Sequence, residues 1–233
     1  MSLIIVHSPK GGVGCTTLAA NIAAWLSRSG REVLAADFAT HDNLSLHFGR
    51  EAEAGEGRRG VQLLDRSGSL SAEALLDEIE RVLDAQGEPR DNGPALIVDV
   101  PAGAPALAER LARRATIRLC VLAADAASAA MLPVILEHPP QAGEAPFHFV
   151  LNGLDERRSV GLGFQRLLRE TVGDDLVGTI RRDEAVNEAL AALSPLFDHA
   201  PASAAAADIA TLANRIAASI DDVRAPRRAA VEA

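Results

Sequence analysis

The stretch that decides the fold is SPKGGVGCTT, residues 8–17, which follows a short apolar run and precedes a helical pattern. The standard phosphate-binding loop reads G-x-x-x-x-G-K-[ST]. Here Pro9 occupies the position of the first glycine and Cys15 that of the lysine, while Gly14 and Thr16 agree with the pattern. A strand before the loop and a helix after it are the context that such a loop requires. The stretch therefore predicts a phosphate loop altered at two positions.

The glycines of this stretch predict that the loop still binds phosphates. Without side chains they let backbone N–H groups point inward, and the N-terminus of the following helix adds about half a positive charge. Thr16 offers a hydroxyl to Mg²⁺. We expect ATP and Mg²⁺ as cofactors, with the phosphates held by Lys10, Gly11, Gly12, Val13, Gly14, Cys15, Thr16 and Thr17.

Cys15 removes the point charge that a lysine brings to the β- and γ-phosphates, and such charge stabilisation is typically worth several kcal/mol in catalysis. Two interpretations of the thiol remain open. A cysteine at a helix N-terminus can have a lowered pKa and act as a redox or nucleophilic group. The favoured interpretation is a small residue that fills the space of the missing lysine.

Short apolar runs alternate with helical patterns along the chain, which predicts βαβ units around a parallel sheet. The runs do not alternate with polar residues, as expected for strands that are covered on both faces. The fold class is therefore α/β, a doubly wound and mostly parallel sheet. The expected strands are Leu3–His7, Glu32–Ala36, Ala95–Val100, Ile117–Ala123, Phe147–Leu151 and Leu176–Ile180.

Helical spacing of apolar residues predicts a first helix from Leu18 to Leu26 that stops at Gly30. A second helix is expected after an N-cap at Ser71, and a last one from about Ala204 to Ile220. Residues 50–60 and 86–94 are expected as surface loops. We predict a single domain over residues 1–222 and a disordered tail over residues 223–233.

Charge and composition exclude several functions. The formal net charge of −9 argues against non-specific binding of nucleic acid. No apolar stretch approaches the ~18–20 residues that cross a bilayer, and the amino terminus lacks the features of a signal peptide. Two cysteines in different kinds of segment do not suggest a disulfide framework. We expect a cytoplasmic protein without direct membrane insertion.

Asp99 ends the apolar run ALIVDV, residues 95–100, where an open α/β sheet normally places a group linked to the metal. The loop KGGVGCTT, residues 10–17, resembles the deviant phosphate loop of the MinD/ParA class of dimerising ATPases. The resemblance implies that Lys10 reaches the nucleotide of a partner subunit across a two-fold interface. Nucleotide binding and homodimer formation would then be linked.

The same resemblance assigns further residues. It places Asp37 near Mg²⁺ as the first carboxylate of an Asp-x-Asp pattern whose second Asp orients the attacking water; that second position is Ala39 here. His41 and Asp42 are open alternatives for the missing carboxylate. Asp99 resembles the Walker B carboxylate. The metal residues are thus Thr16, Asp37 and Asp99, and the expected nucleotide contacts beyond the loop are Asn152, Arg181 and Asp183.

Several segments read together resemble the BcsQ (YhjQ) family of bacterial cellulose-synthesis operons, a branch of the MinD/ParA class. They are DNLSLHFG, ADAASAAMLP, LNGLDERRSVG and the stretch from residue 181 to residue 213. This resemblance implies a cytosolic subunit, peripheral to the inner membrane, that binds the cellulose synthase complex and its cytosolic accessory proteins. No nucleic acid is expected as a partner.

Cys15 and Ala39 stand at the two positions where catalytic residues are expected, so we predict nucleotide binding with weak or absent hydrolysis. Two alternatives remain. A positioning ATPase, of the ParA, MinD or pilus-polarity kind, would need turnover. An interaction module that has abandoned nucleotide would have no reason to retain the glycines, Lys10, Thr16 and Asp99.

Overall fold

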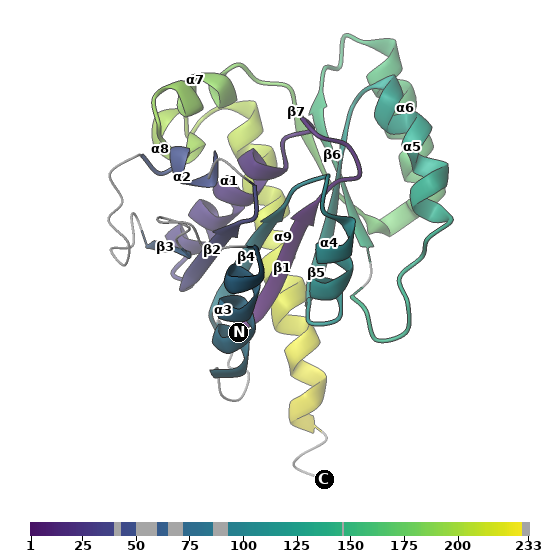
Figure 1. The fold of residues 1–233 in the computed structure, drawn as a ribbon. Helices are drawn as coiled ribbons and strands as arrows, with labels where there is room; N and C mark the ends of the chain where they lie inside the picture. Colours follow the sequence, from purple (N-terminus) through teal and green to yellow (C-terminus); the bar gives the residue numbers. More distant parts are fainter. Residues whose placement is uncertain (40–42, 50–59, 65–71, 86–92, 146, 230–233) are drawn as a thin grey trace.

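The computed structural model describes residues 1–39, 43–49, 60–64, 72–85, 93–145 and 147–229. The described residues form one parallel sheet with helices on both faces (Figure 1), which confirms the predicted doubly wound α/β class. The strands are β1 Ser2–His7, β2 Val33–Asp37, β3 Val61–Leu64, β4 Ala95–Val100, β5 Ile117–Ala123, β6 Phe147–Leu154 and β7 Leu176–Arg181. The helices are α1 Cys15–Arg28, α2 Asn43–Leu46, α3 Ala72–Ala85, α4 Pro105–Ala112, α5 Ala126–Leu136, α6 Ser159–Val172, α7 Ala185–Ala191, α8 Leu196–His199 and α9 Ala204–Ala229, with the 3-10 turn η1 at Gly173–Asp175.

The strand order β3-β2-β4-β1-β5-β6-β7 places β1 between β4 and β5. The chain therefore builds one half of the sheet on one side of β1 and the other half on the opposite side. Such a reversal opens a crevice at the carboxyl ends of the strands, where ligands bind in this class of fold. The N-terminus and the carboxyl end of α9 lie at the other end of the sheet (Figure 1).

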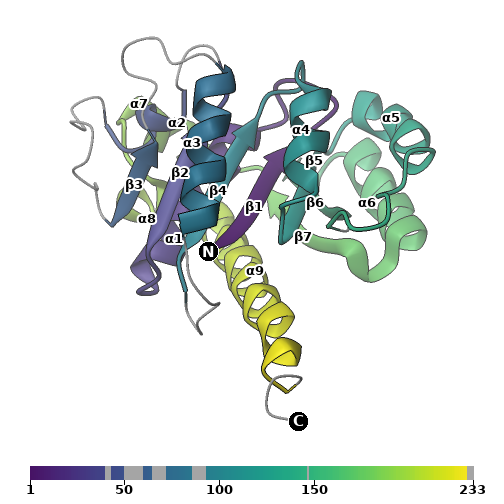
Figure 2. The same cartoon turned by 60° about the horizontal axis from the view of Figure 1, so that its bottom comes forward.

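Alternate residues of each central strand face two apolar cores. Ile4 and Val6 of β1 pack toward α1 and α9, while Leu3 and Ile5 pack toward α3 and α4. A third cluster joins β5 and β6 to α5 and α6 on the same face as α3 and α4 (Figure 2). Every residue of β4 is buried, as continuous apolar runs in parallel sheets predict.

The structure differs from the sequence-based expectation in three places. The sheet contains β3, which the sequence did not predict, and β6 continues to Leu154 past an irregularity in its register with β7. The last helix begins at Ala204 as expected but runs to Ala229, so the backbone of residues 223–229 is helical where a disordered tail was predicted. The expected N-cap Ser71 and most of both expected loops lie outside the described residues.

Within the described part of the chain, no helix combines the length and the apolar character needed to cross a bilayer. The longest helix, α9, packs Ile209, Leu212, Ile216 and Ile220 into the core next to α1, as its spacing predicts.

Candidate functional site

The loop between β1 and α1 has the backbone of a phosphate cradle. Gly12 and Gly14 adopt φ angles of 75° and 95°, a left-handed conformation that residues with side chains rarely adopt. Gly14 is the N-cap of α1 and also faces a tight neighbour, since a Cβ there would lie 2.4 Å from Nδ2 of Asn152. The conformation favours glycine at this position, and a Cβ would force the end of the Asn152 side chain to move.

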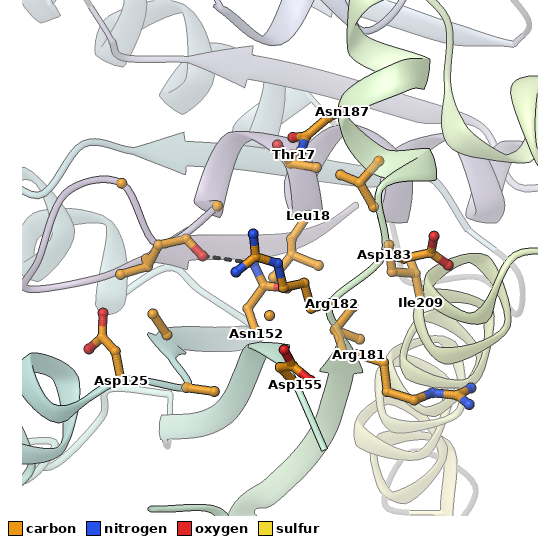
Figure 3. Close-up of a pocket in the computed structure, with 18 of the residues that line it drawn as sticks. Thr17, Leu18, Asp125, Asn152, Asp155, Arg181, Arg182, Asp183, Asn187 and Ile209 are labelled. Carbon is orange, nitrogen blue, oxygen red and sulfur yellow. Dashed lines mark hydrogen bonds between the residues drawn. The ribbon is translucent and has the colours of Figure 1, made fainter. Parts of the chain in front are cut away.

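Asn152, expected to contact the base, also supports the loop. Its Nδ2 donates a hydrogen bond to the carbonyl oxygen of Val13 at 2.7 Å, a bond drawn dashed in Figure 3. Asn152 comes from β6, two strands away from the start of the loop, so the contact joins the carboxyl ends of separate strands. The side chain lines the cavity beside the loop and fixes the loop at the same time.

The expected metal residues lie together at the carboxyl ends of β2 and β4. Asp37 and Asp99 are paired in register, and the Thr16 hydroxyl donates to Oδ2 of Asp99 at 2.5 Å. Burial raises the pKa of Asp99 to about 7, with the Thr16 hydrogen bond opposing that rise and the neighbouring Asp37 adding to it. A hydroxyl and two carboxylates are ligands that Mg²⁺ prefers, so the residues present fit that ion.

The second position of the Asp-x-Asp pattern, where a carboxylate is expected, is occupied by Ala39. Asp37 accepts hydrogen bonds from the backbone N–H groups of Ala39 at 2.6 Å and Leu44 at 3.1 Å, which fixes the turn after β2. Ala39 presents only a methyl group to the adjoining cavity. His41 and Asp42, the alternatives for the missing carboxylate, lie outside the described residues. Among the described residues, no group of three or more His, Cys, Asp or Glu forms a metal cluster.

Two cavities meet at the phosphate loop and share Gly12, Val13, Gly14 and Thr17. The first, here called the metal cavity, measures about 450 Å³ and includes Lys10, Thr16, Ala39 and Asp99 in its wall. The second, here called the base cavity and drawn in Figure 3, measures about 520 Å³. Beyond the expected contact residues, the base cavity is lined by others, three of them in the segment 181–188 that the family resemblance places at the pocket or its rim; they include Leu18, Arg158, Arg182, Val186, Asn187 and Ile209.

The segment after β7 borders the base cavity, but its expected contact residues have other partners. Arg181 turns toward α9 (Figure 3) and pairs with Asp208, Nε to Oδ2 at 2.8 Å. Asp183 accepts from the backbone N–H groups of Ala185 and Ala205, at the starts of α7 and α9. The neighbouring Arg182, which the sequence did not single out, lies among the residues that surround the cavity (Figure 3).

Lys10 forms an ion pair within its own chain. Its Nζ lies 2.6 Å from Oδ2 of Asp125, the N-cap of α5, and the two side chains are 33% and 46% exposed. Burial of Asp125 opposes ionisation, but hydrogen bonds from Lys10 and Ser128 prevail and lower its pKa. The sequence contains no second lysine, so 22 of its 23 basic residues are arginine.

Cys15 lies at the start of α1, and burial raises its pKa, with Asp99 and Cys120 adding to the effect. The thiol is therefore protonated at neutral pH. This finding contradicts the reactive-thiolate interpretation and favours the space-filling one, because reactive cysteines require a lowered pKa.

Comparison with known proteins identifies the class. The family model described as cellulose biosynthesis protein BcsQ matches residues 80–216, and a model described as AAA domain matches residues 1–81. Curated proteins give no significant match to the sequence.

Solved structures share the fold over almost the whole chain. A ParA family ATPase from Chlorobium tepidum TLS has a TM-score of 0.72 at 18% identity, covering 91% of this chain and 97% of its own. A chain of the MinC:MinD cell division protein complex of Aquifex aeolicus has a TM-score of 0.70 at 20% identity, covering 93% of this chain and 95% of its own. MinD from Pyrococcus horikoshii OT3, complexed with Mg-ADP, has a TM-score of 0.67 at 23% identity, covering 92% and 95%. The fold is thus that of the MinD and ParA ATPases, and the chain, matched over more than half its length, belongs to the BcsQ family of cellulose biosynthesis proteins.

Proposed function

We propose that this protein binds ATP with Mg²⁺, forms a homodimer around the nucleotide, and hydrolyses it slowly or not at all. It acts in the cytoplasm as an accessory subunit of the inner-membrane cellulose synthase complex, peripheral to the membrane through protein partners. The family assignment supports the cellulose role. The observation that carries the nucleotide role is the phosphate loop between two cavities, with a hydroxyl and two carboxylates on one side.

We assign the phosphates and Mg²⁺ to the metal cavity and the adenosine group to the base cavity. The metal cavity has Thr16 and Asp99 in its wall, and Asp37 is paired in register with Asp99 on the neighbouring strand; these three residues would hold Mg²⁺. The loop N–H groups and the start of α1 favour the phosphates. The base cavity is large enough for an adenosine group, since typical sites for small molecules measure about 300–1,000 Å³. When bound, Mg²⁺ would supply charge neutralisation at the phosphates.

Lys10 links nucleotide binding to dimer formation. Its ion pair with Asp125 is partly exposed, and such pairs are worth about 0–1 kcal/mol. Release of the ammonium therefore costs little, and the phosphates of a nucleotide in a second subunit are a stronger electrostatic partner. Asp125 would hold the lysine in the free subunit until a partner arrives.

Weak turnover follows from what the site lacks. Cys15 is a protonated, space-filling thiol, so this position contributes no positive charge within the subunit. Ala39 has no polar side-chain group that could orient water, and its backbone N–H is bonded to Asp37. The site therefore keeps residues that would bind the nucleotide and Mg²⁺, while positions 15 and 39 lack the side chains that would accelerate hydrolysis.

The test is light scattering on a sizing column after long incubation with ATP and Mg²⁺, with identification of the nucleotide that elutes with the protein. We expect a dimer that carries ATP. A dimer carrying ADP, or one that dissociates with time, would support a positioning ATPase instead. A monomer without nucleotide would contradict the proposal and favour the alternative, an interaction module that no longer binds nucleotide.

Variants at position 10 separate binding from dimer formation. Lys10→Ala should bind ATP as a monomer, while Arg166→Ala, which removes one exposed positive charge on α6, should dimerise normally. Reductive methylation with ¹³C-formaldehyde labels one lysine in this sequence, so the NMR signal of Lys10 can be followed directly. The signal should shift when ATP and Mg²⁺ are added to the wild type; an unchanged signal in a dimer would exclude the lysine contact.

A further inference from the structure

His47, the residue after the short helix α2, is a buried histidine whose ring nitrogens have no hydrogen-bond partner in the described part of the chain. The residue is 3% exposed and lines the metal cavity. Among the described residues, the unpartnered side-chain nitrogens that are sealed from solvent belong to His7, Arg118 and His148. The ring nitrogens of His47 are not among them, so they keep access to solvent, and they do so through the metal cavity that the residue lines.

The segment that carries His47 is fixed on both sides of the ring. Leu44 and Phe48 are buried in the apolar core that contains α1, beside which α2 lies (Figure 1). The backbone N–H of Leu44 also donates to Asp37 at 3.1 Å. Asn43 lines the same cavity, but its side chain is exposed. The ring of His47 is therefore held in place before a ligand arrives, whereas the amide of Asn43 is not packed in this way.

The place of His47 in the site points to the end of the phosphate chain. The base cavity and the metal cavity meet at the phosphate loop, and His47 lines the metal cavity but not the base cavity. A nucleotide whose base occupies the base cavity would follow the loop into the metal cavity. Its terminal phosphate, the group that distinguishes ATP from ADP, would then lie on the side of the loop where His47 lies.

The chemistry of the ring defines the contact that it can make. Burial lowers the pKa of His47 to about 4, so the imidazole is neutral at pH 7 and carries one N–H donor. Phosphate oxygens accept hydrogen bonds, so the ring N–H is the group that can reach them. Buried polar groups without a partner are rare in folded proteins, and this contact would supply the missing one. Because the thiol of Cys15 brings no charge, the contact would also replace part of what the usual lysine provides.

We propose that His47 donates a hydrogen bond to the terminal phosphate of ATP and thereby makes the site prefer ATP to ADP. The inference rests on the proposed nucleotide function. The contact is made within the subunit that binds the nucleotide, unlike that of Lys10. It therefore persists when dimer formation is prevented.

Calorimetry of the wild type and of His47→Leu tests the preference. The ligands are ADP and AMP-PNP, a non-hydrolysable analogue of ATP, each with Mg²⁺. We expect the affinity of His47→Leu for AMP-PNP to fall about tenfold or more, and its affinity for ADP to change less than about twofold. His47→Gln, which keeps an N–H donor, should recover part of the loss. Equal losses for the two nucleotides would indicate a structural role and refute the proposal, as would an unchanged affinity for AMP-PNP.

Two controls separate this contact from other effects of the substitution. His148→Leu removes an imidazole of β6 that lines neither cavity, and it should leave both affinities unchanged. The comparison is then repeated in a Lys10→Ala background, which we expect to bind nucleotide as a monomer. The selective loss of AMP-PNP affinity should remain there. A loss confined to protein that dimerises would place the effect at the dimer interface and overturn the contact.

NMR of wild-type protein labelled with ¹⁵N-histidine follows the ring directly. The sequence contains six histidines, and the signal missing from His47→Gln identifies His47. AMP-PNP with Mg²⁺ should shift the ring nitrogen signals of His47 and slow the exchange of its N–H with water, and ADP with Mg²⁺ should not. If both nucleotides bind and His47 responds to neither, or equally to both, the assignment of His47 is wrong and the proposed function stands. If neither nucleotide binds, the two proposals fail together.

Discussion

The three glycines of the phosphate loop allow backbone strain and side-chain crowding to be measured separately. An added Cβ meets nothing within 4 Å at Gly11 or Gly12, but at Gly14 it would lie 2.4 Å from Asn152. Gly12 and Gly14 have positive φ angles, and Gly11 is not among the residues that do. Alanine therefore introduces neither backbone strain nor a clash at Gly11. It introduces backbone strain alone at Gly12, and both strain and a clash at Gly14.

The expected changes in the free energy of unfolding follow in the same order. Gly11→Ala should be neutral or stabilising by up to about 1 kcal/mol, because it restricts the unfolded chain. Gly12→Ala should cost about 1–2 kcal/mol for a left-handed residue with a side chain. Gly14→Ala should cost about 2–3 kcal/mol, since displacing Asn152 also breaks its hydrogen bond to Val13, worth about 1 kcal/mol.

Urea unfolding of nucleotide-free protein provides the assay. The single tryptophan, Trp25, lies on α1 with its ring centroid 4.9 Å from that of Phe197, so its fluorescence reports the packing of that helix. In an Asn152→Ala background the clash disappears, and the cost of Gly14→Ala should fall to that of Gly12→Ala. Equal costs for Gly12→Ala and Gly14→Ala in the wild type, or an unchanged cost of Gly14→Ala without Asn152, would refute this account of the loop.

Three further changes have defined outcomes. Ala39→Asp should raise steady-state ATP hydrolysis about tenfold or more, measured by phosphate release, if a missing water-orienting carboxylate limits the rate. Burial lowers the pKa of His47 to about 4, so the folded protein favours the neutral imidazole; the stability that this provides is full above pH 6.5 and is lost as the pH falls toward 4. In urea unfolding at pH 4 and pH 7, His47→Gln should reduce the difference in the free energy of unfolding between the two pH values by up to about 3 kcal/mol. Asp221→Ala should cost about 2 kcal/mol, because it unpairs the buried guanidinium of Arg31, whereas the same change at the exposed Asp222 should cost less than about 0.5 kcal/mol.

The fold could be predicted because the central strands are buried on both faces and therefore read as unbroken apolar runs. The edge strand β3 gives no such signal: it has four residues, VQLL, of which only Val61 is fully buried. The carboxyl end of α9 extends beyond the predicted helix for a related reason. Apolar periodicity stops at Ile220, but the following residues include alanines and arginines, which favour helix without needing a core.

The backbone part of the candidate site followed from local sequence, and the side-chain part did not. The glycines predicted a phosphate loop between a strand and a helix, and in the structure Gly12 and Gly14 of that loop have positive φ angles. Arg181 pairs with Asp208, and Asp183 accepts from Ala205 as well as from the nearby Ala185. Asp208 and Ala205 lie on α9, more than twenty residues away in the sequence, so no local pattern indicates these two contacts. The hydrogen bond from Asn152 to Val13 in the phosphate loop could not be predicted either, because the two residues are far apart in the sequence.

The residue type at position 10 is itself evidence about its function. The other 22 of the 23 lysine and arginine residues in the chain are arginine. An arginine would pair with Asp125 at least as well, because its planar guanidinium matches a carboxylate with two parallel hydrogen bonds. The ion pair with Asp125 therefore gives no reason for a lysine. A compact ammonium at the end of a flexible stem is instead suited to approach phosphate oxygens as a point charge. With Cys15 at the usual lysine position, Lys10 is the one ammonium side chain that the sequence can offer to a nucleotide. Its partly exposed ion pair in the wall of the metal cavity is weak enough for the ammonium to reach the nucleotide of a second subunit, as we propose.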